Sequence, residues 1–236
     1  MMGRCLFMRK GEVHTAPSHI DANTLLLLHC NDLNDSSPYG VSITNHGATV
    51  SDAQSKFGRK SLYINGNQYL TIPAINFGAG DFTVDWWEYV TDANCGTRFT
   101  TLFPASHASQ AGGLMVGWLS NGKPSIFLST QTTGSANWDV LAGENTFVQN
   151  AYSTWVHRAV VRSGNNLLLF TNGTLEITVS IGSVSVGYNA SLPFAIGKWA
   201  YDYSASGSYF VGYIDEFRVS NIARWTENFT PPMKPY

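Results

Sequence analysis

The chain has 236 residues, of which 13% are charged and 13% are aromatic, and its formal net charge at pH 7 is −2. This composition excludes the low hydrophobicity of disordered chains and the charge-rich pattern of coiled coils. It also lacks the basic excess that is typical of nucleic-acid-binding domains and of segments that bind acidic membranes, so we expect neither kind of partner.

The first 22 residues show no hydrophobic period, which predicts an N-terminal arm over residues 1–22 and one large domain over residues 23–236. No apolar run approaches the roughly 20 residues that a membrane-spanning helix needs. The beginning of the chain lacks the apolar core and cleavage site of a secretory signal peptide, so we do not expect secretion by that route. The three cysteines have no paired spacing, which predicts neither a disulfide framework nor a zinc site.

Segments rich in β-branched and aromatic residues predict short strands along the whole chain. The first strand is expected over residues 24–29, and a loop rich in turn residues follows it. Strands over 61–66 and 69–72 flank Asn65-Gly66, a dipeptide typical of tight hairpins, so we expect these two strands to pair with each other. A long strand is expected over 82–90.

An irregular stretch follows, and strands over 114–119 and 124–129 then flank a second Asn-Gly dipeptide at 121–122. Further strands are expected over 155–162, 167–170, 175–180 and 194–197. About a dozen strands without a convincing helix predict an all-β protein with a two-sheet antiparallel sandwich.

The closing strand begins near Phe210 and alternates between two kinds of side chain. Strict alternation places Val211, Tyr213, Asp215 and Phe217 on one face of the strand. It places Glu216 on the other face, so the adjacent carboxylates Asp215 and Glu216 are expected to point in opposite directions.

Five phrases occur in a characteristic order along residues 24–230. They are Asp81-Phe82-Thr83-Val84 with Trp87, Trp155-x-His157-x-Ala159-Val160, Leu167-x-Leu169-Phe170-x-Asn172-Gly173, Ala195-Ile196-Gly197, and Gly212-Tyr213-Ile214-Asp215-Glu216-Phe217-Arg218-Val219. The series resembles the concanavalin A-like, laminin G-like jelly-roll family. The resemblance implies an antiparallel jelly-roll sandwich.

The end of the sequence carries a narrower resemblance. The phrase Ala223-Arg224-Trp225-x-x-Asn228-Phe229-Thr230-Pro231-Pro232 is similar to the ends of laminin G-like domains in virion proteins of tailed phages. This resemblance implies a structural or adhesive role on a virus particle.

Residue patterns give little support for catalysis. The sequence contains no HExxH motif and no Gly-x-Ser-x-Gly motif. Glycoside hydrolysis needs two carboxylates that face one cleft, and glucanases of similar fold carry a Glu-x-Asp-x-x-Glu strand that is absent here. We therefore do not expect an enzyme.

Carboxylates in the loop after the first strand raise the question of calcium. Asp32 and Asp35 supply the hard oxygen ligands that calcium prefers. Many laminin G-like domains hold calcium, and by that resemblance Asp35 and Asp215 are candidate ligands. The alternative, which we favour, is that Asp32 and Asp35 organise turns through hydrogen bonds and that Asp215 pairs with an arginine or with backbone N–H groups.

Glycan binding is the more specific functional prediction, because sugar sites combine exposed aromatic rings with carboxylate or amide groups. Aromatic residues in or beside the predicted loops, with two neighbouring carboxylates, are the candidates: Trp118, Trp138, Asp139, Trp199, Tyr201, Asp202 and Tyr203. Each ring could instead pack in the core, as most aromatic side chains do.

Together these features predict a non-enzymatic phage virion protein, a decoration or tail-appendage component that attaches through its N-terminal arm to virion proteins or to another copy and binds cell-surface glycans. It would assemble in the host cytoplasm. The alternatives are a bacterial extracellular carbohydrate-binding module and, with less support, a divergent glycoside-active enzyme.

Overall fold

The computed structural model describes residues 20–66, 68–91, 113–118, 124–130, 132, 138–146, 152–197 and 210–236. Within these ranges the chain forms fourteen strands and no helix, which confirms the all-β prediction. In that part of the chain, accordingly, there is no helix long and apolar enough to cross a membrane.

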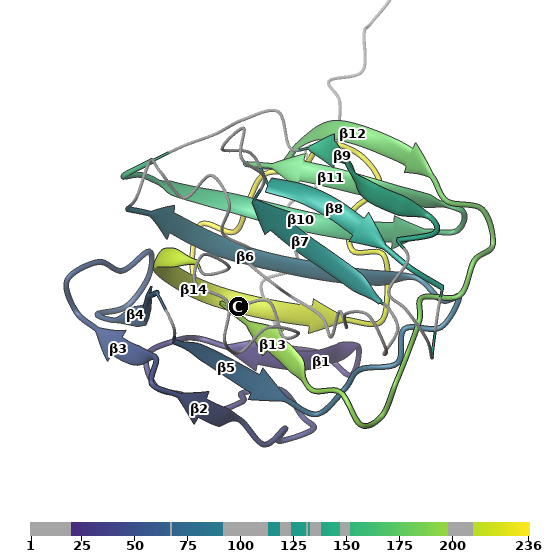
Figure 1. Ribbon diagram of the computed structural model, residues 1–236. Helices are drawn as coiled ribbons and strands as arrows, with labels where there is room; N and C mark the ends of the chain where they lie inside the picture. Colours follow the sequence, from purple (N-terminus) through teal and green to yellow (C-terminus); the bar gives the residue numbers. More distant parts are fainter. Residues whose placement is uncertain are drawn as a thin grey trace, which may run out of the picture.

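The strands form two layers (Figure 1). One layer is an antiparallel sheet in the order β12-β11-β10-β6-β14-β4-β3, with β1 also paired to β14. Its strands are β1 (Thr24–Leu28), β3 (Thr49–Ser51), β4 (Ser61–Asn65), β6 (Phe82–Val90), β10 (Trp155–Ser163), β11 (Asn166–Thr171), β12 (Thr174–Ser180) and β14 (Val211–Ser220).

The second layer consists of two three-stranded sheets, which lie in front of the large sheet in Figure 1. The first has the order β13-β5-β2, formed by β13 (Phe194–Ile196), β5 (Tyr69–Ile72) and β2 (Thr44–His46). The other has the order β7-β8-β9, formed by β7 (Leu114–Trp118), β8 (Pro124–Leu128) and β9 (Leu141–Thr146).

The main core is one cluster of buried apolar side chains from both layers. Leu62, Val84 and Trp86 come from the large sheet, whereas Leu70 and Ile126 come from the second layer. Burial of one such side chain stabilises the fold by about 1.5–3 kcal/mol, so this cluster is the main source of stability.

The predicted hairpin between residues 61–66 and 69–72 is wrong. β4 pairs with β14 and β3 in the large sheet, whereas β5 pairs with β13 and β2 in the second layer. Gly66 has a φ of 79°, a left-handed conformation that favours glycine. Between β4 and β5 the chain passes from one layer to the other, and Leu62 and Leu70 face the same core from opposite sides.

Strict alternation along β14 is also wrong, because a β-bulge interrupts the strand. Asp215 pairs with Trp87 and Arg218 pairs with Asp85, so two residues of β14 oppose one residue of β6. Glu216 takes a left-handed conformation with a φ of 50° at this point. Ile214 before the bulge and Phe217 and Val219 after it therefore face the core together, while Tyr213, Asp215 and Arg218 face outward.

The other two Asn-Gly dipeptides lie between strands that do pair with each other. β7 pairs with β8, as expected for the strands on either side of residues 121–122, which lie outside the described residues. Asn172 and Gly173 both have positive φ between β11 and β12, the geometry of a tight hairpin turn.

Residues 221–236 cross the outer face of the large sheet and form a second, smaller core there. Trp225 and Phe229 stack at a ring-centroid distance of 4.0 Å and cover Ala159, Val161 and Phe170. This part of the chain is called the C-terminal tail below.

The C-terminal tail also touches the turn at Gly173, where a Cβ atom would lie 1.9 Å from the carbonyl oxygen of Phe229. Only glycine leaves room for the tail at this point.

Candidate functional site

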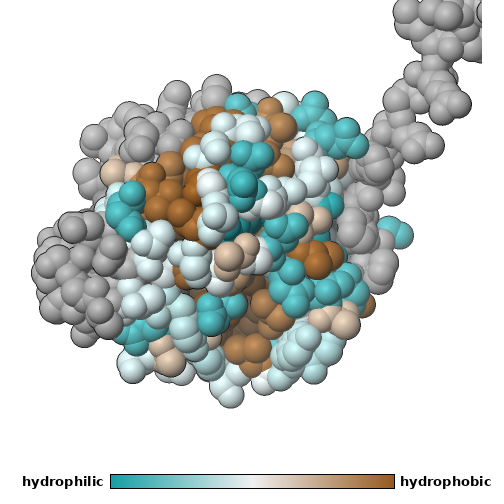
Figure 2. Space-filling view, turned by 90° about the vertical axis from the view of Figure 1, so that its right-hand side faces the viewer, coloured by the Kyte–Doolittle hydropathy of each residue, from teal (hydrophilic) through white to brown (hydrophobic). Residues whose placement is uncertain are grey.

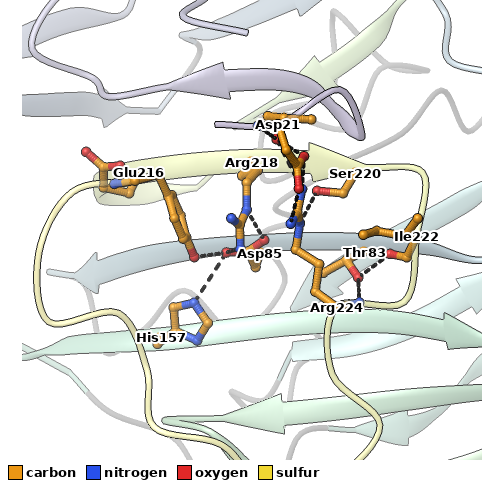
Figure 3. A network of polar contacts seen from close by, with 11 residues as sticks. Asp21, Thr83, Asp85, His157, Glu216, Arg218, Ser220, Ile222 and Arg224 are labelled. Carbon is orange, nitrogen blue, oxygen red and sulfur yellow. Dashed lines mark hydrogen bonds and ion pairs between the residues drawn. The ribbon is translucent and has the colours of Figure 1, made fainter. Parts of the chain in front are cut away.

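The outer face of the large sheet is divided into a part covered by the C-terminal tail and a part that is not. The covered part holds a charge network centred on Asp85 of β6 (Figure 3). Arg218 donates to Asp85 from Nε at 3.0 Å and from Nη2 at 3.3 Å, and the hydroxyl of Tyr236 donates to the same carboxylate. His157 Nε2 lies 3.5 Å from Asp85 Oδ2.

Burial and charge act in opposite directions on this network. Burial by itself would raise the pKa of Asp85, but the Arg218 guanidinium and the contacts with His157 and Tyr236 together hold the pKa below its ordinary value. Burial lowers the pKa of His157, so its ring is neutral near pH 7. The network is therefore an Asp85–Arg218 ion pair beside a neutral histidine.

A second ion pair ties the C-terminal tail to the start of β1. Arg224 donates to Asp21 from Nη2 at 2.8 Å and from Nη1 at 3.1 Å, and its Nε donates to the hydroxyl of Ser220 at 2.6 Å. Those hydrogen bonds from Arg224 hold the pKa of Asp21 well below its usual range. Asp21, which the sequence places in the N-terminal arm, thus contributes to the folded domain; residues 1–19 lie outside the described residues.

Asp215 and Glu216 have different partners, and neither faces a shared cleft with the other. Glu216 lies 2.8 Å from Nδ1 of His29, which raises the pKa of that histidine, and it also accepts from the backbone N–H of Tyr236. Asp215 Oδ2 accepts from the backbone N–H groups of Lys56 at 2.8 Å and Phe57 at 3.1 Å. Burial raises the pKa of Asp215 to about 7.

The candidate calcium ligands form hydrogen bonds within the protein. Asp32 Oδ1 accepts from the N–H of Asn34, and Asp35 Oδ1 accepts from the N–H groups of Ser37 and Leu27. These contacts, and those of Asp215 with backbone N–H groups, are the ones expected under the alternative to a calcium site. No group of three or more His, Cys, Asp or Glu residues in the described part of the chain is arranged to hold a metal ion.

The uncovered part of the same face carries a row of aromatic rings across four strands. Tyr63 of β4 pairs with Tyr213 of β14, which pairs with Tyr89 of β6, which pairs with Trp155 of β10. Successive ring centroids are 4.7, 6.0 and 5.6 Å apart. All four rings are half-buried, so each rests on the sheet and leaves part of its surface to solvent. These four residues are called the aromatic row below.

Tyr213 lies between two other phenol rings of the aromatic row. Burial raises the pKa of Tyr213, and the neighbouring Tyr63 and Tyr89 act in the same direction. The three tyrosines of the row present hydroxyl groups, which can donate and accept hydrogen bonds. Sequence analysis missed this row, because its members lie on four strands and align only once the pairing is known.

Two of the predicted binding residues, Trp138 and Asp139, lie together just before β9. The Trp138 ring is half-buried and packs on Phe127 of β8 at a centroid distance of 5.3 Å. The Asp139 carboxylate accepts from the N–H of Thr130 at 2.8 Å and from its hydroxyl at 2.5 Å. Gly143 leaves the space that the Phe127 ring needs, since a Cβ there would lie 2.4 Å from the ring.

The remaining predicted residues are not placed together by the structure. Trp118 is the last residue of β7, and its side chain is outside the described part. Trp199, Tyr201, Asp202 and Tyr203 also lie outside the described residues.

Solved structures of similar fold include a domain of an arabinanase and binding regions of toxins. The chain matches domain 4 of AbnA, an extracellular arabinanase from Geobacillus stearothermophilus solved with arabinotriose, at 22% identity and a TM-score of 0.63, covering 85% of this chain and 93% of that one. It matches the binding domain of Paraclostridial Mosquitocidal Protein 1 at 17% identity and a TM-score of 0.59, covering 85% and 49%.

A third match is botulinum neurotoxin type C, whose cell entry is described as dependent upon interaction with two ganglioside molecules, at 15% identity and a TM-score of 0.61, covering 85% and 48%. The chain thus spans about half the length of the two toxin fragments. At these identities the likeness concerns the fold.

A search of curated protein sequences finds no match to this chain. A family model described as the concanavalin A-like lectin/glucanases superfamily matches residues 64–228, well over half of the sequence. The matched region extends from β4 through the bulged closing strand to Asn228 in the C-terminal tail. The chain therefore belongs to the concanavalin A-like lectin/glucanase superfamily.

Proposed function

We propose that this protein is a non-enzymatic domain that binds glycans through the aromatic row. The observation that carries the proposal is the alignment of four half-buried rings, Tyr63, Tyr213, Tyr89 and Trp155, in adjacent positions across four paired strands. Sugar rings have C–H faces that pack on aromatic rings and hydroxyl groups that need hydrogen-bond partners. The aromatic row supplies both on one rigid surface.

Rigidity favours binding at this surface. The rings stand on the most extensively paired strands of the large sheet, so little side-chain or backbone freedom is lost when a ligand settles on them. Several adjacent rings favour an extended oligosaccharide over a single sugar, because each ring adds contact area without further loss of overall motion.

Structures of similar fold support this class of ligand by analogy. The arabinanase domain was solved in complex with arabinotriose, and the neurotoxin is described with ganglioside molecules. Both ligands contain sugars. Fold alone does not fix a ligand, so the argument for this chain depends on its own rings.

The carboxylates support a binding role over a catalytic one. Glycoside hydrolysis uses two carboxylates that flank one glycosidic bond. The adjacent carboxylates of β14 are instead buried in contacts with the protein itself: Asp215 accepts from backbone N–H groups, and Glu216 contacts His29.

The place of action is proposed from the closing phrase and the N-terminal arm. The resemblance of residues 223–232 to phage virion proteins favours attachment to a virus particle, with the part of the arm before Asp21 contacting virion proteins or another copy. Within the described structure, Arg224, Trp225, Asn228 and Phe229 all make contacts inside the domain. The arm is therefore the better candidate for the anchor.

Mass spectrometry of purified virions tests this placement directly, since the chain should be detected in them.

A truncated chain tests the role of the arm. The chain that begins at Asp21 should fold but fail to assemble onto particles that lack the protein. Equal attachment of the truncated and full-length chains would show that the arm is not the anchor.

One observation favours a second candidate, a carbohydrate-binding module of an extracellular degradative system. The likeness to the arabinanase domain covers 93% of that domain, so this chain has nearly the whole fold of a domain that occurs in an extracellular arabinanase. Binding to plant polysaccharides and absence from virions would favour the carbohydrate-binding module. Binding to bacterial surface glycans would favour a protein of the virus particle.

A glycan array with purified protein tests the function. Wild-type protein should bind extended neutral glycans, and Trp155→Ala and Tyr213→Ala should each weaken binding at least about tenfold without loss of fold. The matched control is Tyr39→Ala, which removes an exposed tyrosine outside the aromatic row.

Trp138→Ala separates the aromatic row from the surface predicted from sequence. Binding that is lost in Trp138→Ala and kept in Trp155→Ala would assign the site to Trp138 and overturn the role of the row. No binding to any glycan would overturn the proposed function.

A further inference from the structure

The second layer contains a hollow on the side of the sandwich away from the aromatic row. It lies where β2 and β5 meet the segment before β13 and has a volume of about 280 Å³. Its lining combines four small hydroxyl side chains with five apolar residues: Ser42, Thr44, Thr71, Ser191, Ile72, Pro73, Ala74, Ala190 and Pro193. On the side of the molecule seen in Figure 2, apolar residues lie in separate patches among polar ones.

A histidine ring contacts Thr71, one of the residues that line this hollow. His46 of β2 pairs with Tyr69 of β5, and the two rings stack at 4.1 Å with only 8° between their planes. His46 Nε2 lies 3.0 Å from Oγ1 of Thr71, which itself lines the hollow. His46 is exposed, so one face of its ring rests on Tyr69 while the residue remains open to solvent.

The chemistry of the lining defines the ligand. The residues that line the hollow carry no charge, so neither a phosphate nor a metal ion would find a counter-charge there. Hydroxyl groups donate and accept, which suits a ligand with many hydroxyls of its own. The volume lies just below the range usual for drug-sized ligands and is enough for one or two sugar rings.

We propose that this hollow is a second saccharide site, which binds a single neutral sugar residue against His46 and the hydroxyl groups of Thr44 and Thr71. The inference extends the proposed glycan-binding function to the opposite layer. It makes the domain bivalent: the aromatic row binds an extended chain, and the hollow binds a terminal or branching residue. Two sites on one rigid domain raise the apparent affinity for a surface that displays many glycans.

Two variants test the hollow. Ala190→Trp fills it, and because Ala190 is exposed the fold should tolerate the larger ring. Thr71→Val keeps the shape of the side chain and removes the hydroxyl that contacts His46. The matched control is Ala53→Trp, at an exposed alanine outside the hollow.

The measurement is a titration of ¹⁵N-labelled full-length protein with glucose, galactose, arabinose and their linear trisaccharides, followed by amide chemical shifts. At least one monosaccharide should shift the amides of Thr44, Thr71 and Ser191. Ala190→Trp should weaken this binding at least about tenfold and Thr71→Val about threefold to tenfold, while Ala53→Trp leaves it unchanged.

The outcomes separate this inference from the proposed function. Shifts confined to Tyr89, Tyr213 and Trp155 would overturn the second site and leave the first in place. Shifts at the hollow that persist in Ala190→Trp would also overturn it, since the sugar would then bind elsewhere. No shifts at either surface with any sugar would overturn both proposals.

Discussion

The same outward face of β6, β10 and β14 has two ends with opposite characters. At one end Tyr213, Tyr89 and Trp155 lie side by side and remain half-exposed. At the other end Arg218 and Asp85 are fully buried beneath the C-terminal tail. All three strands run through both ends, and the bulge at Glu216 keeps Arg218 on the same outward face as Tyr213.

Cover by the C-terminal tail explains the difference. Once the tail removes water, each charge on the sheet needs a partner, and the Asp85–Arg218 pair with the Tyr236 hydroxyl meets that need. Where no tail crosses the face, the sheet presents broad amphipathic rings instead. A single face of this fold thus serves both as a structural interior and as a binding surface.

The largest expected effect comes from breaking the buried charge pair. Arg218→Met should lower the free energy of unfolding by about 3–5 kcal/mol, because it leaves the buried Asp85 carboxylate without its main partner. Urea unfolding of the variant measures this loss. Adding Asp85→Asn to the same chain should restore part of the stability, and an Arg218→Met protein as stable as wild type would contradict the role of the network.

A pH-dependent effect is expected at Asp215. Its pKa in the folded state is about 7, above its unfolded value, so the folded state favours the protonated acid. The wild type should therefore lose stability as the pH rises from about 4 to about 7, relative to Asp215→Asn, by at most about 4 kcal/mol. Urea unfolding of both proteins across that range measures the difference.

The same residue distinguishes a calcium site from a structural role. A calcium ligand would be ionised and would gain stability from the metal, and EDTA would then lower the melting temperature of the wild type. We expect EDTA to leave the melting temperature of the wild type unchanged, because Asp215 Oδ2 and Asp35 already accept hydrogen bonds from protein donors.

The pH prediction has its own contradicting outcome. A constant difference in the free energy of unfolding between wild type and Asp215→Asn at all pH values would contradict the raised pKa of Asp215.

A smaller effect is expected where the C-terminal tail meets the β11–β12 turn. Asn228 Oδ1 accepts from the N–H of Leu175 at 2.8 Å, at an exposed position. Asn228→Ala should cost about 0.5–1.5 kcal/mol, the net value of one hydrogen bond, and should leave glycan binding unchanged. Weaker binding in this variant would show that the covered and uncovered ends are coupled.

The smallest effect on stability is expected at the aromatic row itself. Tyr213→Phe removes only a hydroxyl from a half-buried ring and should change the melting temperature very little. If the hydroxyl contacts a sugar, binding should still weaken several-fold. A large loss of stability in Tyr213→Phe would indicate that the row is mainly structural.

Much of the fold follows from local patterns in the sequence. The strand at 69–72 and the long strand at 82–90 occur where β-branched and aromatic residues predict them. The turn at Asn172-Gly173 follows from the positive φ that this dipeptide tolerates. These features depend on neighbouring residues alone.

Features that depend on distant residues were not predictable. The strands on either side of Asn65-Gly66 could have paired with each other or with other strands. In the structure β4 pairs with β14 and β5 pairs with β13, and both partners come from much later in the sequence. The bulge at Glu216 similarly depends on contacts with His29 and Tyr236, from the two ends of the domain. Short polar strands such as β2 have no hydrophobic alternation to reveal them.

The candidate site was less predictable for the same reason. Loop position pointed to Trp138 and Asp139, which are neighbours in the sequence and contact Phe127 and Thr130; their role in binding stays a prediction. Tyr63, Tyr89 and Trp155 lie on strands and resembled core residues, because only the sheet order reveals that they share an exposed face.

Hydrogen exchange measured with and without a bound linear oligosaccharide tests the central claim most directly. The account predicts slower exchange in peptides from β4, the end of β6, the start of β10 and the start of β14, where the aromatic row lies. The C-terminal tail, residues 221–236, should show no change. Protection of the tail, with none at the aromatic row, would contradict the assignment of the uncovered end as the binding surface.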